Sequence, residues 1–355
     1  MRAFSYNALP YRVVFGVGTL EKLSEEVERL GARRALVLST PEQRAQAEDV
    51  AKRLGARAVG VYDQAVMHTP IESARAAREE ARRLDADCAV AVGGGSTVGL
   101  GKAIALESSL PIVAIPTTYA GSEMTPILGI TENGVKKTVR DMRIVPKVVI
   151  YDPSLTLTLP VGFSATSAMN AIAHCVEALY AQDANPIISL IAEEGIRALS
   201  QGLPLVVKEP RNLEARSDML YGAWLAGASL GAVGIALHHK LCHTLGGSFN
   251  LPHAETHTVV LPHAVAYNAS AAPEAIARVE RAMQVPSAAA GLYDLAASTG
   301  APLSLKQIGM KEQDLDRAAD IAVQSPYWNP RPIERSAIRR LLDEAFFGRR
   351  PVHRN

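Results

Sequence analysis

The first 150 residues alternate short apolar runs with amphipathic helical patterns. The apolar runs predict buried strands at residues 34–40, 57–62, 88–92 and 112–115. The segments between them repeat their apolar positions with a helical period. Alternation of strands and helices at this spacing predicts an α/β domain, Rossmann-like, with a parallel sheet covered on both faces.

From Pro153 onward the strand pattern disappears, and long segments rich in Ala, Leu, Glu and Arg follow. We therefore expect two domains: an α/β domain over residues 1–152 and an all-helical (all-α) C-terminal domain over residues 153–355. Within residues 127–150, the Asn133-Gly134 step favours a β-hairpin arm. The cleft between the domains is the expected place for a ligand.

The composition is that of an ordinary globular protein, with 48% hydrophobic residues, 21% charged residues and a formal net charge of +1. These values argue against disorder and against a basic nucleic-acid-binding face. The three cysteines cannot form a paired framework, which favours a reducing compartment. The sequence shows no signal peptide and no apolar run as long as a membrane span, so we expect a cytoplasmic protein.

The glycine run Gly93-Gly94-Gly95-Ser96 follows a predicted strand and opens a predicted helix. Glycines let the backbone approach a phosphate, and the helix N-terminus offers N–H groups and a partial positive charge. A tight turn without a ligand is the alternative, but three consecutive glycines exceed what such a turn needs. Thr117 and Thr118 end the next strand, where their hydroxyls either contact a nucleotide or bond local backbone.

The first strand ends at Ser39-Thr40-Pro41 and carries no acidic residue there. Dinucleotide sites that prefer NAD often place a carboxylate at this turn or after the second strand. Neutral hydroxyls neither repel a 2′-phosphate nor hold a 2′-hydroxyl strongly. The choice between NADH and NADPH therefore stays open.

Residues 237–263 hold six of the nine histidines. His239 and His243 are four residues apart and share one helix face, as do Asn170 and His174 upstream. A Gly-Gly pair is expected to end the first of these helices, leaving His253 in a Pro-His turn. This arrangement is typical of a metal site in a helical domain, except that an amide stands where a carboxylate is expected. The alternative is that the histidines only line a cleft.

The GGGS turn, the PTTYAGSE segment and the HxxxHxLGG pattern with its later Pro-His together resemble the iron-containing (group III) alcohol dehydrogenase superfamily. The segments SAMNAIAHCVEALYA (167–181) and HHKLCHTLGG (238–247) are similar to its maleylacetate reductase branch. The resemblance covers nearly the whole chain. It implies the dehydroquinate synthase-like fold, an NAD(P)H-dependent oxidoreductase activity and a homodimer.

The resemblance also assigns residues. In the metal-dependent relatives an aspartate and three histidines hold the metal, and these positions fall on Asn170, His174, His239 and His253. His243 matches a histidine implicated in catalysis near the nicotinamide, and Lys136 matches a lysine near the cofactor in some relatives. The nucleotide positions fall on Ser39, Gly94, Gly95, Ser96, Thr117 and Thr118.

Asn170 changes the chemistry that this set supports. A divalent cation at the site would depend on one anionic oxygen, and an amide offers only a neutral carbonyl oxygen. Three histidines remain a reasonable zinc set, so the substitution weakens metal binding without excluding it. We therefore expect a vestigial site and no essential metal.

The expected reaction is NAD(P)H-dependent reduction of the enone double bond of maleylacetate to 3-oxoadipate, in the degradation of aromatic compounds. His243 and His253 are the candidates for stabilising and protonating the enolate. Asn170, His174 and His239 would form a polar cradle for the substrate, and Lys136 and Arg140 are candidate partners for its carboxylates. The alternatives are a metal-dependent alcohol or polyol dehydrogenase of the same fold and a non-catalytic nucleotide-binding protein.

Overall fold

The computed structural model describes residues 4, 6, 8–9, 11–67, 69–132, 135–324 and 327–352. They form two compact units, Ala8–Leu159 and Pro160–Asn355. The first unit extends beyond the boundary expected at Asp152-Pro153. The reason is local, because the Asp152 carboxylate accepts hydrogen bonds from Leu20 N at 3.1 Å and Ser154 N at 3.1 Å. These bonds hold the short helix η6 (Pro153–Thr156) to the first unit.

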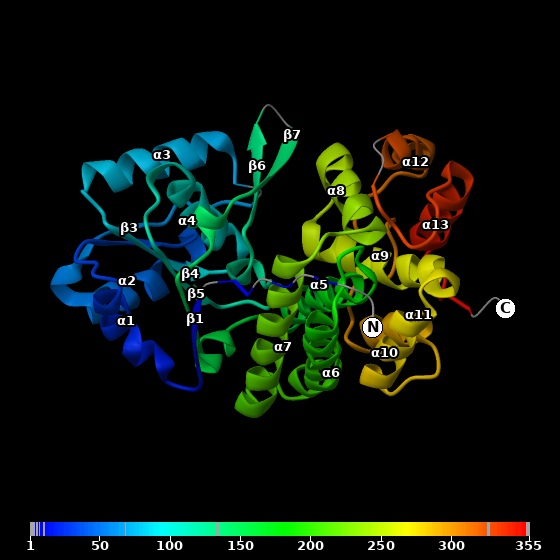
Figure 1. The fold of residues 1–355 in the computed structure, drawn as a ribbon, viewed down its shortest axis with the longest axis horizontal. Helices are drawn as coiled ribbons and strands as arrows, with labels where there is room; N and C mark the ends of the chain where they lie inside the picture. Colours follow the sequence, from blue (N-terminus) through cyan, green and yellow to red (C-terminus); the bar gives the residue numbers. More distant parts are fainter. Residues whose placement is uncertain are drawn as a thin grey trace. The chain divides into compact units, whose positions relative to one another are not determined.

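The first unit contains a six-stranded parallel sheet in the order β1-β8-β5-β4-β2-β3. The strands are β1 (Arg12–Phe15), β2 (Ala35–Leu38), β3 (Ala58–Tyr62), β4 (Cys88–Gly93), β5 (Ile112–Pro116) and β8 (Val148–Tyr151). The parallel sheet and the strands β2 to β5 confirm the sequence prediction (Figure 1). β1 and β8 were not among the strands predicted from the sequence.

Helices cover both faces of this sheet, as expected. They are α1 (Leu23–Arg29), α2 (Arg44–Leu54), α3 (Ile71–Arg83) and α4 (Gly95–Ser108). Because side chains alternate along a strand, Val37 of β2 packs with α1 and α2, whereas Leu36 and Leu38 pack with α3 and α4. The two cores are therefore built on opposite faces of the same strands.

A separate antiparallel hairpin joins β6 (Ile127–Glu132) to β7 (Val135–Arg140). Its position agrees with the predicted arm within residues 127–150. The Asn133-Gly134 step that predicted its turn lies outside the described residues.

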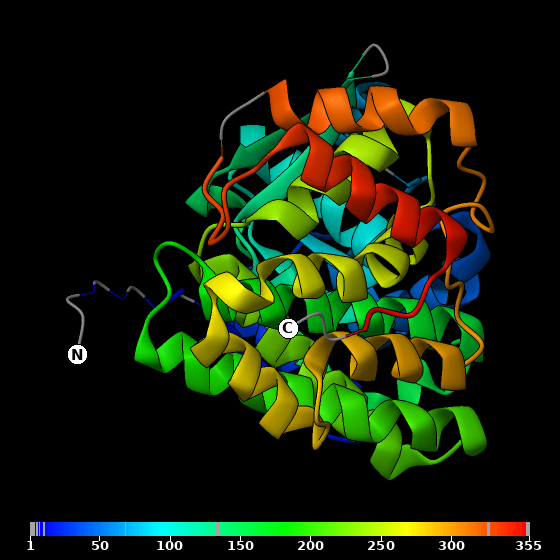
Figure 2. The same cartoon turned by 90° about the vertical axis from the view of Figure 1, so that its right-hand side faces the viewer.

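The regular secondary structure among the described residues of the second unit is helical (Figure 2). Its helices are α5 (Val161–Tyr180), α6 (Pro186–Lys208), α7 (Leu213–Ala232), α8 (Leu237–Phe249), α9 (His253–Asn268), α10 (Pro273–Met283), α11 (Ala288–Ser298), α12 (Leu315–Gln324) and α13 (Arg335–Phe347). Side chains of α12 and α13 share one buried core with α8 and α9. Across the part of the chain that is described, no single helix combines the length and apolarity needed to cross a membrane.

Close helix packing fixes α5, which carries Asn170 and His174. A Cβ atom at Gly195 of α6 would lie 2.8 Å from Sγ of Cys175 on α5. A Cβ at Gly222 of α7 would lie 2.6 Å from Cγ of Leu199 on α6. Real Cβ atoms do not approach so closely, so these glycines let the three helices pack at short distance.

The junction between α8 and α9 differs from the sequence prediction. Gly246 and Gly247 do not end α8, which continues to Phe249 and stops at Asn250 in the left-handed conformation, with φ of 54°. A glycine within a helix costs only about 1 kcal/mol relative to alanine, so packing overrides it. His253 is consequently the first residue of α9 and does not lie in a loop.

Candidate active site

Six histidines from three helices of the second unit form one contiguous cluster. His174 comes from α5, three come from α8 (His238, His239 and His243), and two come from α9 (His253 and His257). The ring centroids of His174 and His239 are 5.1 Å apart, those of His239 and His243 are 6.3 Å apart, and those of His253 and His257 are 4.4 Å apart. The structure therefore brings together all four histidines that the sequence singled out.

Exposure divides this histidine cluster into two layers. His238 and His257 are fully buried, and Asn170, His174 and His239 are nearly so. His243 and His253 are the two cluster members that remain partly exposed. A ligand that enters the cluster from solvent thus reaches the two histidines expected to act in proton transfer.

The buried layer is held by direct contacts between side chains. His238 Nε2 lies 2.9 Å from His257 Nδ1, and Cys242 Sγ lies 3.8 Å from His238 Nε2. Burial, reinforced by neighbouring histidines, lowers the pKa of His174, His238 and His257 well below the ordinary value. These three rings are therefore neutral at working pH. Burial raises the pKa of the Cys242 thiol, which removes any role as a nucleophile.

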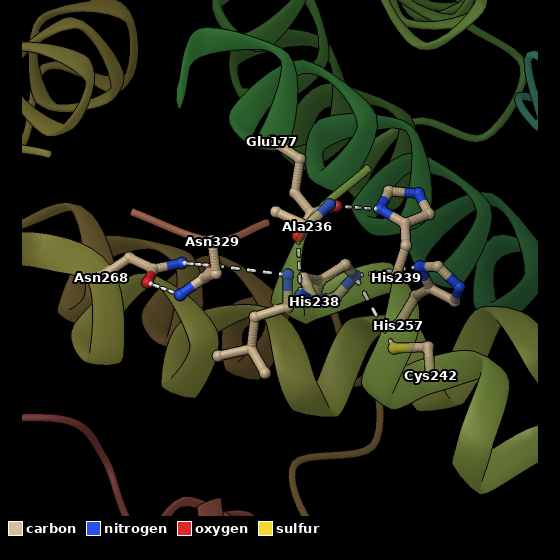
Figure 3. Close-up of polar contacts among 9 residues, drawn as sticks. Glu177, Ala236, His238, His239, Cys242, His257, Asn268 and Asn329 are labelled. Atoms are coloured by element: carbon tan, nitrogen blue, oxygen red, sulfur yellow. Dashed lines mark hydrogen bonds and ion pairs between the residues drawn. The ribbon is translucent and has the colours of Figure 1, made fainter. Parts of the chain in front are cut away.

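Glu177 is a buried carboxylate of the cluster that the sequence analysis did not single out. Its Oε1 accepts a hydrogen bond from His238 N at 2.6 Å, and its Oε2 accepts one from Ala236 N at 2.9 Å. Oε2 also lies 2.7 Å from Nδ1 of His239 (Figure 3). Glu177 follows His174 by three residues, so the helical spacing that selected His174 was also the available signal for Glu177.

Asn170 and four histidines of the cluster each have a buried polar atom without a hydrogen-bond partner in the described structure: Asn170 Oδ1, His174 Nδ1, His238 Nδ1, His239 Nε2 and His257 Nε2. Leaving a polar atom buried and unpaired costs about 1–3 kcal/mol, so such atoms are rare unless a ligand or a water molecule satisfies them. These atoms indicate that the cluster receives a polar ligand or ordered water.

The residues at the positions that the resemblance assigns to a metal suit a divalent cation less well than a set with an aspartate would, because Asn170 offers only a neutral oxygen. His174, His239 and His253 remain a reasonable zinc set by themselves. Both oxygens of Glu177 already accept backbone N–H bonds. Among the described residues, the one trio with donor atoms within 4.8 Å of one another is His238, Cys242 and His257.

That trio is no better suited to a metal. Its two ring nitrogens, His238 Nε2 and His257 Nδ1, are 2.9 Å apart, at hydrogen-bond distance. Two nitrogen ligands of one tetrahedral zinc ion are separated by roughly 3.3 Å, given Zn–N bonds of about 2.0 Å. The trio is therefore better described as a hydrogen-bonded pair of rings with a neighbouring thiol.

In the first unit, the expected nucleotide-binding residues lie at the carboxyl ends of the adjacent strands β2, β4 and β5. They are Ser39, Gly94, Gly95, Ser96, Thr117 and Thr118. Gly94 is the N-cap of α4, and no side chain caps that helix. Ser39 Oγ and Thr97 Oγ1 are buried without a partner in the described residues. Free hydroxyls beside an uncapped helix N-terminus fit the phosphates and hydroxyls of a dinucleotide.

The glycine turn is tightly surrounded. Gly93 has a φ of 151°, and a Cβ there would lie 2.5 Å from Thr97 Oγ1. Gln43 donates from Nε2 to Thr117 Oγ1 at 2.8 Å, so this threonine is already partnered and Thr118 is the freer of the pair. The sequence analysis did not identify Gln43, because only the fold places it beside Thr117.

Replacing Gly94 by alanine is expected to weaken NADH and NADPH binding about 5- to 100-fold. The new Cβ would lie 2.9 Å from Thr118 Cγ2, and overpacking of this kind costs about 1–3 kcal/mol. Titration of nicotinamide fluorescence measures the change. Gly101→Ala in α4 is the control, because its Cβ would meet neighbours only at 3.6 Å. Unchanged cofactor affinity in Gly94→Ala would contradict a role for this turn.

The two cationic candidates for the substrate carboxylates, Lys136 and Arg140, both lie on β7 of the first unit. Lys136 is in register with Thr131 of β6, and Arg140 is exposed and in register with Ile127. Their role as substrate-binding residues stays a prediction.

Family models match both units of the chain. Residues 10–153 match the iron-containing alcohol dehydrogenase model, and residues 164–346 match the C-terminal model of the Fe-containing alcohol dehydrogenase family. The curated maleylacetate reductase of Burkholderia cepacia is 62% identical over 351 residues, covering 99% of this chain and 100% of its own length.

Solved structures agree. The crystal structure of a putative alcohol dehydrogenase from Ralstonia eutropha JMP134 is 66% identical, with a TM-score of 0.98, and the match covers 99% of this chain and 100% of that one. The maleylacetate reductase of Rhizobium sp. strain MTP-10005 is 56% identical, with a TM-score of 0.95 and the same coverage. The chain therefore belongs to the iron-containing alcohol dehydrogenase family and is an NAD(P)H-dependent oxidoreductase, similar over nearly its full length to maleylacetate reductases.

Proposed function

We propose that this enzyme reduces the carbon–carbon double bond of maleylacetate to give 3-oxoadipate, without an essential metal. The observation that carries the proposal is Asn170, a buried amide four residues before His174 on α5, at the position where the resemblance places the aspartate of the metal-dependent relatives. The maleylacetate reductase names of relatives at 51–62% identity support the substrate.

The substrate suits a site without a Lewis acid. The double bond of maleylacetate is conjugated to a ketone, and bound NAD(P)H supplies a hydride to the carbon β to that ketone. Negative charge then develops on the ketone oxygen as an enolate, which is a weaker base than the alkoxide formed in alcohol oxidation. Hydrogen-bond donors fixed at the site are sufficient to stabilise such an oxyanion.

His243 and His253 are the residues placed to act on this enolate. Both are partly exposed, whereas burial keeps His174, His238 and His257 neutral. A protonated imidazole donates a hydrogen bond to the ketone oxygen and then delivers a proton to the carbon α to the ketone. In this proposal, Asn170 and His174 line the polar site that receives the substrate.

A chelator experiment tests the absence of a metal. We expect enzyme dialysed against EDTA to reduce maleylacetate at an unchanged rate, with NADH or NADPH, and to contain metal well below one equivalent. The loss of nicotinamide absorbance measures the rate, and elemental analysis measures the metal. Activity that disappears with EDTA and returns with Fe²⁺ or Zn²⁺ would favour the metal-dependent alcohol dehydrogenase. Cofactor binding without turnover of enone or alcohol would favour the non-catalytic protein.

We also propose a metabolic role, a compartment and an oligomeric state for the enzyme. Maleylacetate is an intermediate in the degradation of aromatic compounds, and we place the enzyme in that chemistry, in the cytoplasm and as a homodimer. All three cysteines are free and buried, which suits a reducing compartment. Light scattering coupled to gel filtration tests the oligomeric state.

A further inference from the structure

We propose that Glu177 is a positioning residue, which keeps the ring hydrogen of His239 on Nδ1 and thereby presents Nε2 to the bound ligand as a hydrogen-bond acceptor. The expected effect on turnover rests on the proposed function. The position of the hydrogen on His239 does not, and it can be observed in the resting enzyme.

Glu177 and His239 are in direct contact. Oε2 of Glu177 lies 2.7 Å from Nδ1 of His239, and both side chains are almost completely buried. Each oxygen of Glu177 already accepts a hydrogen bond from a backbone N–H at the beginning of α8, so the carboxyl group acts here as an acceptor and Nδ1 as the donor. A carboxylate on one ring nitrogen determines which hydrogen the imidazole carries, and it leaves the other nitrogen with a lone pair.

Two further hydrogen bonds hold the carboxylate of Glu177 in its orientation. Its two oxygens also accept hydrogen bonds from Ala236 N and His238 N at the beginning of α8. That helix has no side-chain cap of its own at Ala236. Glu177 therefore satisfies helix N–H groups that would otherwise be unpaired, and the helix holds the carboxylate in place.

The imidazole ring of His239 is confined by the rings of neighbouring histidines. It stacks on His174 with ring centroids 5.1 Å apart, and it meets the edges of His238 at 5.2 Å and His257 at 5.0 Å. Turning the ring over would break the bond to Glu177 inside this packed group. Nε2 is therefore fixed on the side away from Glu177, where it is buried without a partner in the described structure.

The fixed orientation of His239 limits which groups of a ligand its Nε2 can bind. A nitrogen with a lone pair accepts a hydrogen bond and repels an anionic oxygen. The chemistry suited to His239 is therefore a donor such as a water molecule, and not a carboxylate or an enolate oxygen. The enolate oxygen is left to His243 and His253, and His239 does not contact the carboxylates of the dianion directly.

Glu177→Gln is the informative variant, because it preserves the size of the side chain. We expect the amide oxygen to stay at the Oε1 position, which accepts the shorter bond, 2.6 Å from His238 N. The NH₂ group then takes the Oε2 position, where it leaves Ala236 N without an acceptor and faces Nδ1 of His239, which must accept. The hydrogen moves to Nε2. Asn329→Ala is the matched control, since Asn329 Oδ1 accepts from Leu237 N at 3.3 Å. This control loosens the beginning of α8 without touching His239.

The experiment uses full-length enzyme labelled with ¹⁵N-histidine. Proton–nitrogen correlation spectra distinguish rings protonated at Nδ1, at Nε2 or at both, and the signals of His239 are those lost in His239→Asn. We expect Nδ1–H in the wild type and in Asn329→Ala, and Nε2–H in Glu177→Gln. The kcat of Glu177→Gln should fall on the order of 10- to 100-fold, with a smaller change in KM. Asn329→Ala should lower the melting temperature and keep its kcat.

Three results would overturn the inference. One is a wild-type His239 with hydrogen on Nε2, whether neutral or doubly protonated, and this reading needs only His239→Asn, for the assignment of the signals. Another is a wild-type hydrogen position in Glu177→Gln. The third is an equal loss of kcat in Glu177→Gln and Asn329→Ala. If the wild type shows Nδ1–H but does not reduce maleylacetate, the proposed function fails and the role of Glu177 in fixing the ring stands.

Discussion

Replacing His243 by alanine is expected to lower the turnover of maleylacetate by about two to four orders of magnitude, the range typical of losing a general acid. His243 lies one helical turn after His239 on α8, with their ring centroids 6.3 Å apart, and it remains partly exposed. It therefore combines access to a ligand with an imidazole, the side chain most often used as a general acid. Steady-state kinetics at saturating NADH and NADPH measure the change in kcat.

Lys240→Ala provides the control for this variant. Lys240 lies on the same helix, is exposed, and has no assigned part in the site. Its kcat should match that of the wild type. The loss in His243→Ala should appear in kcat with cofactor affinity unchanged, because the residues assigned to the nucleotide lie in the first unit. Near-normal turnover in His243→Ala would remove this residue from the mechanism and leave His253 as the general acid.

The sequence predicted strands whose burial is visible as an apolar run in their own residues. β2, β4 and β5 are buried along their whole length, so they appear as continuous apolar runs. β1 is an edge strand with one fully buried residue, Val14, and its sequence is not distinctive. β8 is equally buried and also reads as an apolar run, but its residues up to 150 fell within the segment assigned to the hairpin arm, so it was not predicted as a strand of the sheet.

The candidate site shows the same division. Helical spacing predicted that Asn170 and His174 share a face, and the structure places His174 against His239. Spacing alone did not show that Glu177 of α5 meets the beginning of α8, because that contact joins residues 62 positions apart. Prediction of a helix end at the glycine pair was wrong, because packing by Leu245 and Phe249 continues α8 through it.

Replacing Asn170 by aspartate is expected to tighten Zn²⁺ or Fe²⁺ binding by on the order of 100-fold or more, since affinity depends on the anionic charge of the ligand set. The wild-type cluster already has neutral imidazoles, and Glu177 already orients His239 through Nδ1. Such an outer carboxylate is a regular partner of metal-bound histidine, so the missing component is an anionic oxygen at position 170. Competition with a chromophoric chelator measures the affinity.

Asn185→Asp is the matched control for this change. Asn185 is a second buried amide of the same unit, and its Oδ1 caps α6 by accepting from Ile188 N at 3.1 Å. Aspartate preserves that cap and adds the same charge at the beginning of α6, a helix that carries none of the clustered histidines, so metal affinity should not change. A wild-type enzyme that already binds metal as tightly as Asn170→Asp would show that the amide does not determine metal binding. The proposal that the enone is reduced without a metal would then need a different explanation.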